Sequence, residues 1–170
     1  MRIPIQQQLE SAKRLELVSQ RLGFAIFQLQ SLEHLLASFL VIRVKATKGI
    51  GLEVGNQLLQ KELKQPLGST ITALKAAGVL ESPLADALTA ILKDRNWLVH
   101  RVRQENRGVA FSEPRTSELV LQIDGITERC NDLIQKMETE SRKFTLSQGV
   151  DMNQVEQLAL EIAAKWEIPI

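Results

Sequence analysis

The strongest constraint on this chain is an apolar seam in its last third, whose spacings alternate between four and three residues. This narrow stripe is typical of a helix that packs along another helix in a bundle or coiled coil. The seam consists of Leu119, Ile123, Ile126, Cys130, Leu133 and Met137. A strand would instead alternate apolar and polar residues, and such alternation is scarce throughout the chain. The seam therefore predicts an all-α fold.

Helix breakers divide the rest of the chain into further helical segments. We expect helices over about residues 5–46, bent near Gly23, and over about 56–64, 69–77, 82–106, 115–146 and 151–166. Ser69 and Ser82 are the expected N-caps, and Pro83 follows the second of them. The fold expected is an antiparallel up-and-down bundle of four to five main helices. Residues 1–170 form one domain, with 147–170 either part of it or an appendage.

Charge and composition exclude several classes of function. The net charge is +1, so any binding of nucleic acid must come from a local patch. One cysteine and two histidines favour neither a disulfide nor a metal site, and we expect no cofactor. There is no phosphate-binding loop, nucleophile elbow or zinc-binding HEXXH motif. The first residues do not resemble a signal peptide, and no apolar run approaches membrane-spanning length, so a cytoplasmic location without membrane contact is expected.

Arg95 occupies an unexpected position on the helix predicted after Ser82. The residues three, four and seven positions away from it, which share its helical face, are all apolar. They are Leu88, Ile91, Leu92, Leu98, Val99 and Val102. A guanidinium that leaves water needs an anionic partner. Glu33, on the apolar side of the first helix, is the candidate partner within the chain.

Three further polar residues lie along one flank of this apolar stripe. At about 100° per residue, Asn96 lies about 100° and His100 about 140° around the helix from Arg95, and Arg103 about 80°. The flank would become a cleft if a second copy of the helix packed against it. We therefore treat Arg95, Asn96 and His100 as candidate catalytic residues, with Glu33 in a supporting role.

The six-residue string RNWLVH at positions 95–100 resembles the R-x4–6-H motif of the HEPN superfamily, named for higher eukaryotes and prokaryotes nucleotide-binding. The resemblance covers the bundle from about residue 20 to 146, and its specific part is Arg95, Asn96 and His100. It implies a dimeric bundle whose two motifs form one composite site. Many members of the family are metal-independent endoribonucleases that act as toxins or antiphage effectors, so the resemblance implies RNA as substrate and an antitoxin or effector-complex protein as partner.

The residues suit RNA cleavage. RNA supplies its own nucleophile, the 2′-hydroxyl, so the site needs a proton acceptor, a proton donor and stabilisation of charge on the phosphate. Histidine serves as acid or base near neutral pH, arginine matches phosphate oxygens, and Asn96 is suited to orient His100 or to donate to phosphate. The candidate RNA-binding residues are Arg101, Arg103 and Arg107. No aromatic residue lies among those three arginines to stack on a base.

Two alternatives remain open from the sequence. The first is a non-catalytic HEPN-like adaptor or regulator, similar to mannitol-operon regulators, that binds a protein or nucleotide. The second is a helical scaffold in which a Glu33–Arg95 pair only fixes the register of two helices. The chain has no tyrosine, and Val102 stands where HEPN toxins paired with nucleotidyltransferases often carry one, so silencing by tyrosine modification is excluded. His34 fits an ordinary solvated residue better than a ligand.

Overall fold

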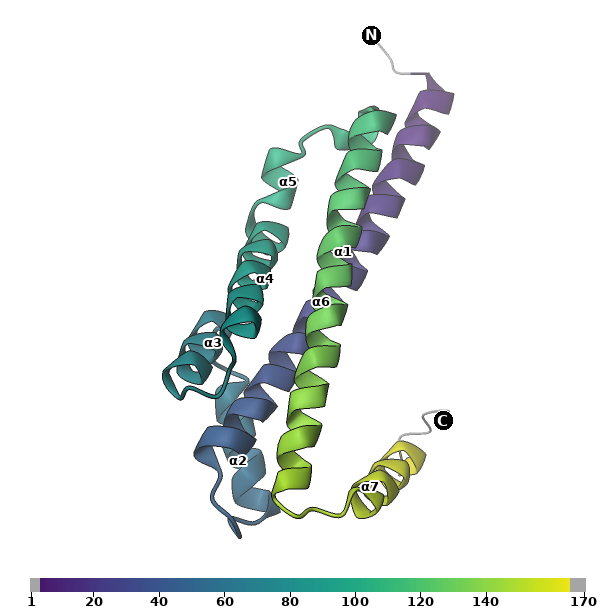
Figure 1. Ribbon diagram of the computed structural model, residues 1–170. Coiled ribbons are helices and arrows are strands. Elements are labelled where there is room, and N and C mark those ends of the chain that lie inside the picture. The colour runs from purple at the N-terminus through teal and green to yellow at the C-terminus, as the bar shows by residue number, and fades with distance from the viewer. Residues whose placement is uncertain (1–3, 166–170) are drawn as a thin grey trace. The chain divides into compact units, whose positions relative to one another are not determined.

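The computed structural model describes residues 4–165, and this range contains seven α-helices and no strand (Figure 1). The predicted all-α class is confirmed. The α-helices are α1 (Ile5–Leu40), α2 (Leu52–Glu62), α3 (Leu67–Ala76), α4 (Ser82–His100), α5 (Val102–Glu105), α6 (Glu113–Ser147) and α7 (Met152–Lys165). A π-helical turn, η1 (Val41–Lys45), continues α1, and a 3-10 turn, η2 (Val109–Phe111), precedes α6.

The chain divides into two compact units, Met1–Met137 and Glu138–Ile170. The first unit contains α1 to α5 and most of α6. The second contains the last turns of α6 and the whole of α7, and within it Arg142 lies 3.9 Å from Glu156. No described residue of α7 is buried, and its expected apolar face, which includes Leu158 and Ile162, is exposed. Trp166, the expected end of this helix, lies outside the described residues.

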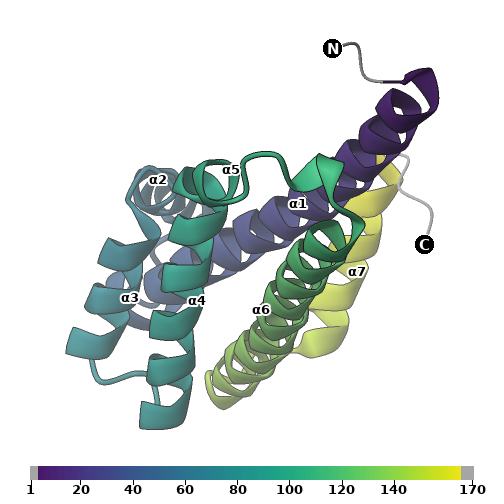
Figure 2. The same cartoon turned by 90° about the horizontal axis from the view of Figure 1, so that it is seen from above.

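Two long helices, α1 and α6, pack against each other and form the core of the first unit with α3 and α4 (Figure 2). All six residues of the seam predicted on α6 are buried, at 3% exposure or less. They meet a row of buried apolar residues on α1, which includes Ala25, Leu29, Leu32, Leu36 and Leu40. Figure 1 shows α1 and α6 running in the same direction and α4 running the opposite way. Because all six of its residues are buried, the alternating seam predicted the buried face of α6 correctly.

Several helix boundaries differ from the sequence prediction. Pro66 occupies the N-cap position of α3 and makes no side-chain capping hydrogen bond, so Ser69 lies inside the helix and does not cap it. Glu81 occupies the N-cap position of α4, and Ser82 is its first helical residue. Gly23 leaves α1 unbroken. Six helices were expected, two of them short, and the four-residue helix α5 brings the number in residues 4–165 to seven.

The first helix is more apolar than we expected from the sequence. Together α1 and η1, Ile5–Lys45, contain an 18-residue window of mean hydropathy 1.4, which is long and apolar enough to cross a membrane by length and composition. This corrects the expectation that no apolar segment approaches that length. In the structure 44% of the window is buried inside the protein. The core helix of a water-soluble protein passes the same test, so packing against α6 accounts for part of this apolar character.

Cys130 lies in the middle of the seam and is fully buried. Burial raises the pKa of its thiol well above the ordinary value, to about 11, because the thiolate loses its hydration. Since only the thiolate reacts, we expect native protein at pH 8 to react with iodoacetamide about 100-fold more slowly than an exposed thiol. Mass spectrometry of timed samples measures this rate, and denatured protein is the control. Rapid labelling of the native protein would contradict the buried position of α6.

Candidate functional site

An ion pair joins α4 to α1 at Arg95. The Nε of Arg95 donates to Oε1 of Glu33 over 3.1 Å, and both side chains are 31% exposed. An anionic partner was expected because the helical neighbours of Arg95 are apolar. Glu33 is that partner, as the sequence predicted. A pair this exposed is screened by water, so its net contribution to stability is expected to be about 0–1 kcal/mol. The contact orients the guanidinium more than it stabilises the fold.

Arg95 lies at the border of the core and not at its centre. Leu88, Ile91, Leu98 and Val102 are buried, whereas Leu92 is half-buried and Val99 is 45% exposed. The apolar arc of α4 is thus wider than the arc that the other helices cover. The apolar arc can be predicted from the periodicity of the sequence, whereas the covered arc depends on where the other helices lie. Arg95 was therefore expected to be more deeply buried than it is.

His100 is the last residue of α4, and its side chain is exposed. In the part of the chain that the structure describes, it makes no hydrogen bond or ion pair. Two shallow surface depressions meet at this histidine. One is lined by His100, Arg103, Gln104 and Arg107, and the other by Lys93, Asn96, Trp97, His100 and Arg101. His100 is therefore an accessible titratable group in a largely cationic setting.

The three residues of the RNWLVH motif are not brought together within one chain. Asn96 and His100 share a depression, and Arg95 lines neither of the two that meet at His100. Arg95 and His100 are five residues apart, which places them about 140° apart around the helix. A site that uses both side chains on one phosphate would therefore need a second surface beside α4.

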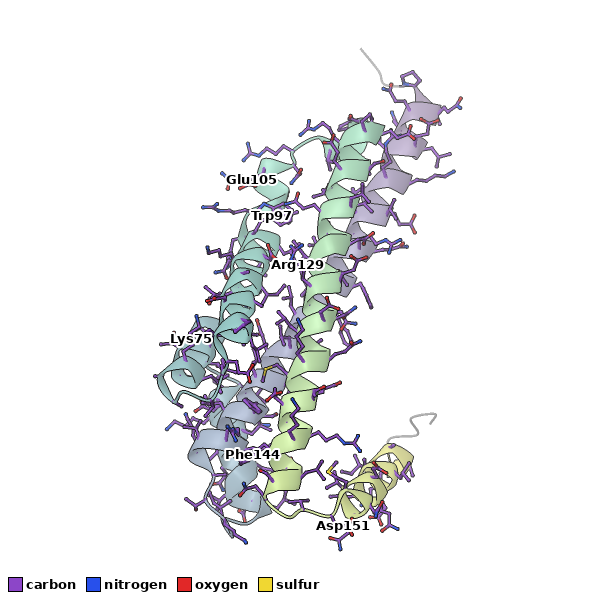
Figure 3. All side chains as sticks on the ribbon, in the orientation of Figure 1. Lys75, Trp97, Glu105, Arg129, Phe144 and Asp151 are labelled. Atoms are coloured by element: carbon purple, nitrogen blue, oxygen red, sulfur yellow. The ribbon has the colours of Figure 1, made fainter. Side chains whose placement is uncertain are left out.

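Lys93 and Trp97 belong to this site and were not among the residues singled out from the sequence. They share a depression with His100 because positions 93, 96, 97 and 100 follow the three- and four-residue steps of one helical face. That spacing is the signal that would have found them. Trp97 is half-buried against the core, and its Nε1 donates to Oε2 of Glu105 over 2.7 Å (Figure 3). An aromatic ring therefore lines the same depression as Arg101, although no aromatic residue lies among the three arginines in the sequence.

The arginines after α4 give the site its charge. Arg101 has only a distant carboxylate, Oε1 of Glu105 at 4.0 Å. Arg103 and Arg107 are exposed and make no ion pair with any residue in the range 4–165. The helix α4 ends at His100, and the four-residue helix α5 follows directly after Arg101. Unpaired guanidinium groups beside an exposed histidine are suited to bind phosphate, since arginine donates from a planar fork and stays charged.

No group of three histidine, cysteine or carboxylate side chains suited to hold a metal ion is found within residues 4–165. Comparisons of the chain with protein-family models, with curated proteins and with solved structures find no match.

Proposed function

We propose that this protein is a metal-independent endoribonuclease of the HEPN type, which acts as a homodimer and serves as a toxin or antiphage effector under the control of a partner protein. The observation that carries the proposal is the accessible His100, which has no partner within residues 4–165 and lines two depressions with cationic side chains. The RNWLVH motif supports the family, and the all-α fold with its late, motif-bearing helix α4 is compatible with it.

The chemistry assigned to the site follows from the substrate. The 2′-hydroxyl of RNA attacks the adjacent phosphorus, and its proton passes to a base. The 5′-oxygen of the next nucleotide leaves and takes a proton from an acid, so the products are a 2′,3′-cyclic phosphate and a 5′-hydroxyl. One histidine in each chain supplies one proton-transfer group, and a second copy supplies the other. Arginines stabilise the extra charge on the phosphate, and Asn96 orients His100 or donates to the phosphate.

The dimer contact that we propose is centred on Val99. This exposed apolar side chain lies on α4 between Arg95 on one side and Asn96 and His100 on the other. A second α4 that covered Val99 and the half-buried Leu92 would bury apolar surface and bring the Arg95 side chain of each copy towards the His100 flank. The second copy would thus provide the surface that a single chain lacks.

Introducing a charge at Val99 tests this contact. We expect Val99→Glu to convert the proposed dimer into a monomer, because the carboxylate would be buried without a partner. RNA cleavage should fall at least in proportion to the dimer lost, because the carboxylate would also repel phosphate. Sedimentation velocity measures the mass, and a cleavage assay measures the activity. Leu121→Glu, at a position on α6 that is 71% exposed, is the matched control. A fully active monomer would rule out the composite site.

The alternative function is a non-catalytic HEPN-like adaptor or regulator that binds a protein or nucleotide at the same surface. The separation of Arg95 from His100 favours this alternative. Arg95 is paired with Glu33 and lies outside the depressions that contain His100. Incubation of purified protein with cellular RNA in excess EDTA distinguishes the two functions. Cleavage supports the ribonuclease, and intact RNA after incubation with folded protein supports the adaptor or regulator.

A further inference from the structure

An apolar groove of about 570 Å³ lies between the N-terminal half of α1 and the η2 turn, with α6 at its floor. We call it the α1–η2 groove. Its main apolar side chains are Leu15, Val18 and Leu22 from α1, Val109 and Phe111 from η2, and Leu119 from α6. All of these belong to the first compact unit. The volume falls within the range of about 300–1,000 Å³ that is typical of small-molecule sites.

The walls of the groove combine buried and exposed apolar residues. Val18, Val109 and Leu119 are buried, whereas Leu15 is 55% and Phe111 is 61% exposed. The η2 wall is held in place because the Nε of Arg14 donates to the carbonyl oxygen of Ala110 over 2.7 Å. Exposed apolar side chains that face a preformed hollow gain free energy when an apolar group covers them.

Cationic side chains line one side of the same groove. Arg103 and Arg107 contribute to its wall and also to the depression beside His100, so they stand between the two sites. The groove-lining residues in the described part of the chain include no aspartate or glutamate. The groove is therefore apolar along its length and positively charged where it meets the His100 depression.

We propose that the α1–η2 groove binds a single-chain amphiphile with an anionic head group, such as a fatty-acid carboxylate. The alkyl chain covers Leu15 and Phe111, and the head group accepts hydrogen bonds from Arg103 and Arg107. A neutral apolar ligand would leave the arginines unsatisfied. A small anion without a chain would leave the apolar walls in contact with water. Only a ligand with both parts matches both features.

Calorimetric titration with dodecanoate, kept below the concentration at which it forms micelles, tests this proposal. We expect saturable binding to wild-type protein, and an affinity about tenfold lower for Leu15→Gln, since that side chain covers the alkyl chain. Leu17→Gln, on α1 but outside the groove lining, is the matched control and retains the wild-type affinity. The double variant Arg103→Ala, Arg107→Ala also binds dodecanoate about tenfold more weakly, because charge-assisted bonds are lost.

Two outcomes would overturn the site. Dodecyltrimethylammonium has the same chain and a positive head group, and we expect it to bind far more weakly than dodecanoate. Equal binding of the two would show that the arginines do not recognise the head group. Sedimentation with phosphatidylglycerol vesicles distinguishes a free amphiphile from a membrane surface. If the protein binds the vesicles and not monomeric dodecanoate, the surface recognises a membrane and the proposal is wrong.

One consequence rests on the proposed ribonuclease function. Because Arg103 and Arg107 line both sites, a bound head group competes with an RNA phosphate for them. Saturating dodecanoate should slow RNA cleavage by the wild type, and a concentration that half-saturates the wild type should slow Leu15→Gln much less, because the tenfold weaker affinity leaves only about a tenth of that variant occupied. Absence of any cleavage would count against the ribonuclease and leave the binding result intact. Full cleavage at saturating dodecanoate would contradict only the proposed competition between the head group and RNA.

Discussion

Replacing His100 with alanine is expected to reduce RNA cleavage by at least about 100-fold, because the change removes the group that we propose transfers the proton. The fold should be unaffected, since the imidazole is exposed and contacts no partner among the described residues. The measurement is the initial rate of cleavage of a defined RNA in excess EDTA. Thermal unfolding of both proteins, recorded in parallel, shows whether the comparison is made at equal folding.

The other histidine of the chain provides the control. His34 is exposed on α1, so His34→Ala removes the same kind of group from another helix. Its cleavage rate should match that of the wild type. If the two alanine variants lost activity equally, or if neither lost any, His100 would not be the proton-transfer group.

Replacing Ile123 with alanine is expected to lower the free energy of unfolding by about 3 kcal/mol. Ile123 is fully buried in the seam of α6, where that helix packs against α1. Truncation removes apolar contacts and leaves a cavity that the surrounding long helices can close only in part. Urea denaturation followed by circular dichroism measures the change, with all proteins at one concentration because formation of the proposed dimer would contribute to apparent stability.

Leu121→Ala is the matched comparison, two residues earlier on the same helix. Leu121 is 71% exposed, so its truncation should change the free energy of unfolding by less than about 0.5 kcal/mol. The pair tests which face of α6 is buried. A larger loss at Leu121 than at Ile123 would mean that α6 is rotated relative to the structure.

The class of the fold and the buried face of α6 were predictable from the sequence, because helical packing imposes a period that the seam repeats for five steps. The partner of Arg95 was predictable for a related reason. Glu33 is an acid on the apolar side of α1, and two charged residues on apolar faces of neighbouring helices avoid unpaired burial by meeting. In both cases the constraint is local to one or two helices.

Other features depend on how helices are placed in three dimensions, which periodicity does not contain. The depth of Arg95 was overestimated because the buried arc of α4 is narrower than its apolar arc. The groove escaped notice because the sequence indicated a loop before Pro114, whereas the structure forms η2 there and holds it against Arg14. Lys93 and Trp97 were not among the candidates from the sequence, yet both line a depression with His100.

Cleavage of total cellular RNA by the purified wild-type protein in excess EDTA tests the central claim most directly, with the ends of the products identified. The proposed mechanism predicts fragments that carry 2′,3′-cyclic phosphates and 5′-hydroxyls. Intact RNA after prolonged incubation with folded, dimeric protein would contradict it and would favour the non-catalytic regulator.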